Sequence, residues 1–191
     1  MKHFKKITYN APVVLTFALV SLGALLLNMA TGGKTNGLLF SVYRSSAATP
    51  MFYVRLFGHV LGHVNWAHYS SNMLLLLLTG PMLEEKYGSK GLLKVILLTA
   101  LTTGLVQVAF FPNSALLGAS GVVFAFILLA SVTGTEKGSI PLTLLVVAAI
   151  YLGQQLYQGI AVQDNVSNLT HIIGGILGGV YGMALRPKKE T

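Results

Sequence analysis

Ser120 is a residue whose type and setting could do chemistry. It lies in the run Gly118-Ala119-Ser120-Gly121, within an otherwise apolar stretch. Glycines on either side remove neighbouring side chains, so the hydroxyl is predicted to be accessible at the end of a cavity. The alternative is a helix-packing face of small residues, in which the serine bonds to a carbonyl one turn earlier. The run therefore predicts either a nucleophile or a packing surface.

His171 is the candidate base for that nucleophile. It stands near the start of an apolar stretch, where a histidine needs a polar partner or a cavity that holds water. Gly174 and Gly178 follow one and two turns later, on roughly the same helix face. They would let another helix approach closely enough for a Ser–His hydrogen bond of about 2.6–3.2 Å. Two packed helices with an incidental histidine are the alternative.

Three further histidines and an asparagine precede the serine. His68 and Asn72 are four residues apart and share a helix face, where both could donate hydrogen bonds to an oxyanion. Tying down loop carbonyls is the alternative role for them. His59 and His63 resemble the two histidines of H-E-x-x-H, but Val60 occupies the position of the glutamate. We therefore predict structural hydrogen bonding for this pair, and no metal or cofactor.

Serine is too weak an acid to ionise alone, so His171 must take its proton during attack. Triad enzymes orient the imidazole with a carboxylate. Near His171 the sequence offers only Asp164, in the preceding loop. A Ser–His dyad held by packing is the simpler prediction.

The composition indicates which solvent surrounds these residues. The chain has 191 residues, of which 53% are hydrophobic and 9% charged, whereas soluble domains carry about 25% charged residues. The net charge of +8 comes from short basic clusters between apolar runs, a pattern that orients membrane proteins rather than one that binds nucleic acid. Cysteine is absent, which excludes disulfides and thiol chemistry. An all-α polytopic membrane protein is predicted.

We expect a single membrane domain over residues 1–191, with short cytoplasmic ends at 1–10 and 186–191. A span needs about 20 residues to cross about 30 Å of hydrocarbon. The first apolar run is too long for a signal peptide and is read as an uncleaved helix. The six expected spans are Ala11–Ala30, His68–Leu83, Leu92–Phe111, Ala115–Val132, Ile140–Tyr157 and Asn168–Leu185.

The loops give an orientation. With six spans, ten of the 13 Lys and Arg residues fall on the side of both termini, so both termini are predicted to be cytoplasmic. On the other side, residues 31–67 form one long connection. Its second half is moderately apolar and aromatic, which indicates a segment that is partly embedded or lies at the interface. A bacterial plasma membrane protein is favoured by the short chain without cysteine.

Four motifs occur in order along these spans. They are His59-x3-His63-x4-His68-x3-Asn72 preceded by Arg55, Glu84-Glu85-Lys86-Tyr87-Gly88-Ser89, Gly118-x-Ser120-Gly121, and His171-x2-Gly174-x3-Gly178. Together they resemble the rhomboid family of intramembrane serine proteases, over about two thirds of the chain. The resemblance implies a six-helix bundle with a partly embedded loop after the first helix. It also implies Ser120 as nucleophile, His171 as base, and an oxyanion site of His68, Asn72 and the Ser120 N–H.

The sequence departs from that family at two places. Val54-Arg55 stands where the family has Trp-Arg bracing the embedded loop, so the bracing should differ. Phe124 stands where the family typically stacks a tyrosine on the catalytic histidine, so stacking is kept without the phenol.

The predicted function is that of an intramembrane serine endopeptidase whose partners are the lipid bilayer and transmembrane protein substrates. By resemblance, those substrates carry small residues at the cut. A non-catalytic relative that binds membrane helices is one alternative, although such relatives usually lack the serine or the histidine. A channel or transporter is another, but the polar groups cluster in the external half of the spans. No oligomeric state is predicted.

Overall fold

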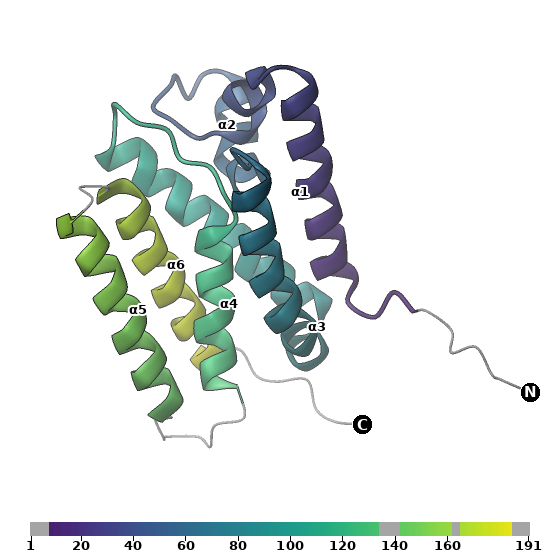
Figure 1. The fold of residues 1–191 in the computed structure, drawn as a ribbon, viewed down its shortest axis with the longest axis vertical. Helices are drawn as coiled ribbons and strands as arrows, with labels where there is room; N and C mark the ends of the chain where they lie inside the picture. Colours follow the sequence, from purple (N-terminus) through teal and green to yellow (C-terminus); the bar gives the residue numbers. More distant parts are fainter. Residues whose placement is uncertain (1–7, 134–141, 162–164, 185–191) are drawn as a thin grey trace, which may run out of the picture.

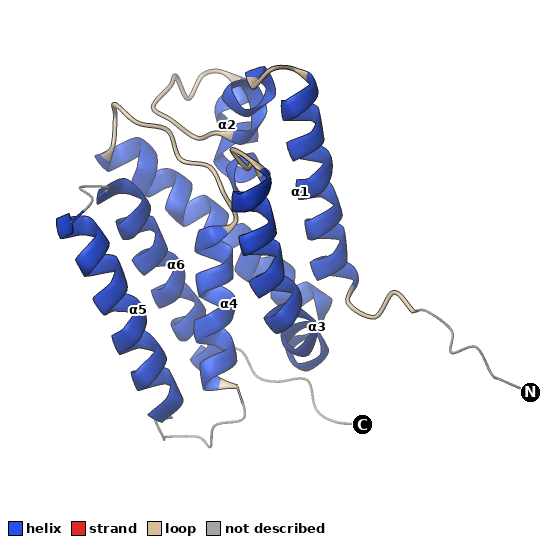
Figure 2. Ribbon diagram, in the orientation of Figure 1, coloured by secondary structure: helices blue, strands red, loops and turns tan. Residues whose placement is uncertain are grey.

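The protein is a bundle of helices. The computed structural model describes residues 8–133, 142–161 and 165–184, which are 80% helical and contain no strand beyond an isolated bridge between Val42 and Leu116 (Figures 1 and 2). The elements are α1 (Pro12–Ala30), η1 (Asn36–Phe40), α2 (Pro50–Gly58), η2 (His59–Leu61), α3 (Trp66–Phe110), α4 (Ser120–Val132), α5 (Leu142–Ala161) and α6 (Asn165–Ala184). The prediction of an all-α protein is confirmed.

A glycine divides α3 into two antiparallel halves. Gly88 has φ +74° and ψ 157°, values that no helix contains and that favour glycine. The chain turns there and returns along the bundle (Figure 1). Among the described residues, α1 and the 45-residue α3 are long and apolar enough to cross a bilayer, and Ser120–Val132 and His171–Tyr181 are shorter apolar helices. The count of six spans stays a prediction.

The start of α4 corrects the expected fourth span. We expected a span over Ala115–Val132 with the serine inside it, but α4 begins at Ser120 itself. The residues before it are extended, and Val42 and Leu116 exchange two backbone hydrogen bonds of 2.9 Å. Gly118, at φ +129°, could not continue a helix towards its N-terminus. In Figure 1 this segment descends from the end of α3, and α4 begins half-way along the bundle.

Between α1 and α3 the long connection is folded rather than free. Phe52 and Leu56 of α2 are buried in a small apolar cluster with Val42. Arg55 is buried too, with its guanidinium 4.5 Å from the ring centroid of Tyr43 and hydrogen-bonded to the Tyr43 hydroxyl. Tyr43 therefore braces the segment where a neighbouring tryptophan was missing from the sequence.

The helix α4 lies at the centre of the bundle. It contacts α3, α5 and α6, and Ala125, Phe126 and Leu129 are fully buried. Because α4 begins half-way along the bundle (Figure 1), its first residue, Ser120, lies between the two ends of the bundle.

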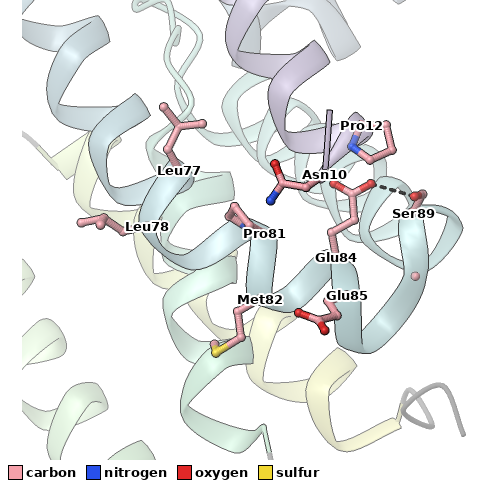
Figure 3. A pocket seen from close by; sticks show the side chains of 10 residues that line it. Asn10, Pro12, Leu77, Leu78, Pro81, Met82, Glu84, Glu85 and Ser89 are labelled. Atoms are coloured by element: carbon pink, nitrogen blue, oxygen red, sulfur yellow. Dashed lines mark hydrogen bonds between the residues drawn. The ribbon is translucent and has the colours of Figure 1, made fainter. Parts of the chain in front are cut away.

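A carboxylate holds α1 against α3. The buried Glu84 accepts hydrogen bonds from the backbone N–H groups of Val13 (2.9 Å) and Val14 (3.0 Å), and Ser89 donates its hydroxyl to the same side chain at 2.7 Å. These N–H groups belong to the first turn of α1 and have no partner within the helix. The negative charge also suits the positive end of the helix dipole. Figure 3 shows Glu84 and Ser89 beside Pro12, on the wall of a cavity of about 740 Å³.

Replacing Glu84 with glutamine should lower the melting temperature in detergent. The amide keeps one acceptor oxygen but loses the charge, so one N–H of α1 stays unpaired at a cost of about 1–3 kcal/mol. The matched control is Glu85→Gln, since Glu85 is exposed and next in the chain. Equal melting temperatures of the two variants would contradict the capping role.

Candidate active site

Ser120 and His171 lie in contact across two helices. Ser120 is the first residue of α4, and His171 lies in the second turn of α6. Ser120 Oγ is 2.6 Å from His171 Nε2. The sequence suggested this pair, and the structure places the two side chains within hydrogen-bonding distance.

Glycines allow that approach. A Cβ at Gly174 would overlap the backbone carbonyl of Gly121, and one at Gly178 would overlap that of Ala125. The backbones of α4 and α6 therefore touch at both levels below the Ser–His pair. Only glycine fits at these two positions of α6.

The ring of Phe124 packs against the imidazole of His171. Its ring centroid is 4.9 Å from that of His171, with an angle of 50° between the planes. Phe124 is one turn after Ser120 on α4, so the same helix supplies both the hydroxyl and the ring. The position therefore restricts the imidazole by packing and contributes no phenolic hydroxyl.

His68 and Gly118 border the space beside the serine. A Cβ built on Gly118 would be 2.8 Å from His68 Cε1, 2.9 Å from His68 Nε2 and 3.8 Å from Ser120 Oγ. The Nε2 edge of His68 thus faces the same small space as the serine hydroxyl. The N–H of Gly118 donates to the carbonyl of His59 at 2.9 Å, which fixes the backbone there.

Asn72 lies one turn beyond His68 and is turned to its own helix. Its Nδ2 donates to the carbonyl oxygen of His68 at 3.0 Å, and the residue is buried. No described hydrogen bond links Asn72 to Ser120. The structure therefore brings together Ser120, His171 and His68, and it places the five predicted supporting residues around them: Gly118, Gly121, Phe124, Gly174 and Gly178. An oxyanion contact from Asn72 stays a prediction, since one of its two amide hydrogens is bound within α3.

The first two histidines of the sequence motif, His59 and His63, have different hydrogen-bond partners. His59 Nε2 lies 3.2 Å from Thr103 Oγ1, and the Thr103 hydroxyl also lies 2.7 Å from the carbonyl oxygen of Thr99. His63 Nδ1 lies 3.1 Å from the carbonyl oxygen of Leu61. Desolvation by burial lowers the pKa of each to about 4, so both are neutral near pH 7.

Gln107 was not predicted from the sequence to support the site. This fully buried residue of α3 donates from Nε2 to the carbonyl and the hydroxyl of Ser114, both at 3.0 Å. It thereby holds the extended segment that leads to Ser120. An amide within an apolar run is a costly group and was the available signal. Asp164, considered as a helper of His171, lies outside the described residues.

Gly118→Ala should lower the melting temperature in detergent, at a cost of about 1–3 kcal/mol of stability, because the space beside Gly118 has no room for a side chain. The new Cβ would displace the His68 ring, and φ +129° strains any residue with a side chain. Gly33→Ala is a control because Gly33 also has a positive φ, +89°, but open space around it. Thermal denaturation of both variants checks this; equal melting temperatures would contradict a tight space at Gly118.

Comparison with known proteins places the chain in a family. The family model described as Rhomboid domain matches residues 51–188, which contain all of these side chains. The chain belongs to the rhomboid family. The family assignment suggested by the four motifs is thus confirmed, and with its apolar helices this rhomboid chain is a membrane protein.

One curated relative shows how far the similarity extends. The chain is 41% identical over 63 residues to "Rhomboid-like protein 11, chloroplastic" of Arabidopsis thaliana. The match covers 32% of this rhomboid chain and 22% of that protein. The word "chloroplastic" describes the location of the plant protein.

Proposed function

We propose that this rhomboid protein is an intramembrane serine endopeptidase with Ser120 as nucleophile and His171 as base. The observation that carries the proposal is the 2.6 Å contact between Ser120 Oγ and His171 Nε2. A serine needs such a base to act as a nucleophile near neutral pH. The family supplies the reaction class, since rhomboid proteins are generally serine proteases.

The first chemical step uses the pair directly. As Ser120 Oγ attacks the carbonyl carbon of the substrate, its proton passes to His171 Nε2. The resulting imidazolium then gives that proton to the leaving amine, and the acyl-enzyme remains on the serine. Water enters next, loses a proton to His171 and releases the acyl group, which restores both side chains.

The negative oxygen of the tetrahedral intermediate would lie at the start of α4. The N–H of Ser120 is one of the first-turn groups that have no partner within the helix, and the helix dipole is positive there. His68 Nε2 faces the same space and would add a second donor, with Asn72 as a third. One such donor is worth about 3 kcal/mol in the transition state.

The substrates we propose are transmembrane segments of other proteins. Peptide bonds within a helix are hidden by its own hydrogen bonds, so the segment must unwind before Ser120 can reach a carbonyl. Helix-weakening Gly or Pro near the cut would favour that step. Small residues at the cut itself are what the resemblance to the rhomboid family implies. Entry is proposed to be lateral or from the outer face.

We place the protein in a bacterial plasma membrane with both termini in the cytoplasm. Basic residues concentrate on the side of the termini. In keeping with that layout, α1 begins and α6 ends at the same end of the bundle (Figure 1).

A fluorophosphonate probe tests the proposal, because it reacts with an activated serine. Purified wild-type protein in detergent should be labelled, and His171→Ala should not be, although Ser120 is still present. Labelling of both forms would contradict the role of His171. Labelling of neither would favour a non-catalytic helix-binding relative, and loss of peptidase activity with a chelator would instead indicate a metal enzyme.

A further inference from the structure

His63 is a buried side chain that the mechanism above does not use. It follows η2 and is fully buried. Its ring centroid lies 5.0 Å from that of His68, at an angle of 67°, and 5.4 Å from that of Tyr69 at 85°. Its carbonyl accepts a hydrogen bond from Asn36 Nδ2 at 2.9 Å. The residue is therefore held in edge contact with His68.

The hydrogen bonds of His63 determine its tautomer. Nδ1 is 3.1 Å from the carbonyl oxygen of Leu61, and a carbonyl only accepts, so Nδ1 carries the hydrogen. Desolvation by burial, together with the charge of a protonated His68, lowers the pKa of His63 to about 4. The ring is thus neutral near pH 7, and Nε2 is a bare acceptor, buried and without a hydrogen-bond partner.

The imidazole of His68 also has a nitrogen that needs a hydrogen-bond donor. For His68 to donate to an oxyanion, Nε2 must carry the hydrogen, which leaves Nδ1 as the acceptor. That Nδ1 is also buried without a hydrogen-bond partner. Two rings in edge contact therefore each present an unsatisfied acceptor. A buried polar group is normally paired with protein or ordered water, and a water has two hydrogens to donate.

We propose that His63 and His68 bind one buried water molecule between them and that His63 thereby acts as a positioning residue for His68. The water donates one hydrogen to His63 Nε2 and the other to His68 Nδ1. This arrangement holds His68 in the tautomer whose Nε2–H faces Ser120. The catalytic consequence rests on the proposed protease function, while the tautomer itself does not.

Three variants separate this role from simple packing. His63→Phe keeps a ring but removes both nitrogens, whereas His63→Gln keeps a donor for Leu61 and an acceptor for the water. Tyr69→Phe is the matched control, since it keeps its ring beside His63 and loses only a bond to the Ala18 carbonyl. We expect His63→Phe to lower kcat by about tenfold or more with KM little changed, and the other two to stay within about threefold of wild type.

Nitrogen NMR of the histidine rings reports which nitrogen of His68 carries the hydrogen. A change in packing alone would not change this tautomer. The signals of His68 are assigned by their loss in His68→Gln. Wild-type protein should show hydrogen on His68 Nε2, and His63→Phe should show a mixture of tautomers while its melting temperature confirms folding. Hydrogen on Nδ1 in the wild type would overturn the proposal, as would an unchanged tautomer and kcat in His63→Phe.

The two proposals can fail separately. If wild-type protein cleaves no reporter but His68 changes tautomer in His63→Phe, the water site stands without the protease. If wild type cleaves and His63→Phe matches it in kcat and tautomer, the protease stands without the water site.

Discussion

Ser120→Ala should remove cleavage of a transmembrane reporter by the purified protein, with a loss of about 10⁴–10⁶-fold in kcat. The alanine leaves no nucleophile, and His171 then has only a water to activate. The melting temperature should change little, because the substitution removes a hydroxyl and its bond to His171 while α4 remains packed. Cleavage is measured on gels after reconstitution, against wild type.

The control for this loss is the partner residue. His171→Ala should cost about as much, and the double variant no more than either single one, because nucleophile and base act as a unit. Additive losses would mean that the two side chains act independently, contrary to the dyad. Unchanged cleavage by Ser120→Ala would remove the assignment of Ser120.

Gly178→Ala should lower both activity and stability, because its methyl would overlap the Ala125 carbonyl. The overlap forces α6 away from α4, two turns below His171. A displacement of about 1 Å between reacting groups can cost about 10²-fold in rate, and overpacking costs about 1–3 kcal/mol of stability. Cleavage rate and melting temperature are both measured.

The neighbouring glycine is a closely matched control. Gly179 has nothing within 4 Å of its would-be Cβ, so Gly179→Ala gains helix propensity of about 1 kcal/mol without an overlap. It should keep wild-type activity and melt slightly higher. If Gly178→Ala behaved in the same way, close contact of α4 with α6 would be unnecessary for the site.

The sequence carried enough information to predict the Ser–His contact. A polar residue is costly in an apolar run, and glycines at helical spacing after His171 indicated that another helix comes close. Both signals are local, since they depend on residue type and spacing within one helix. The site was predictable because the membrane makes its few polar residues conspicuous.

The parts that hydropathy could not predict depend on contacts between distant residues. The apolar run from Ala115 looked like the start of a helix, but its backbone pairs with Val42 and is therefore extended. Likewise, Tyr43 binds Arg55 from outside α2, which no motif indicated. Tertiary contacts override local preference at such places.

The late start of α4 has a consequence for where a substrate would be cut. With 13 residues at about 1.5 Å each, α4 is about 20 Å long, whereas the hydrocarbon core is about 30 Å thick. In the proposed orientation, with the end of α4 at the inner boundary of the hydrocarbon core, Ser120 would lie about 10 Å below the outer boundary, roughly seven helical residues from the end of a substrate's span. The depth of the serine would act as a ruler, so that moving a cleavable sequence towards the middle of the substrate's span takes it out of reach.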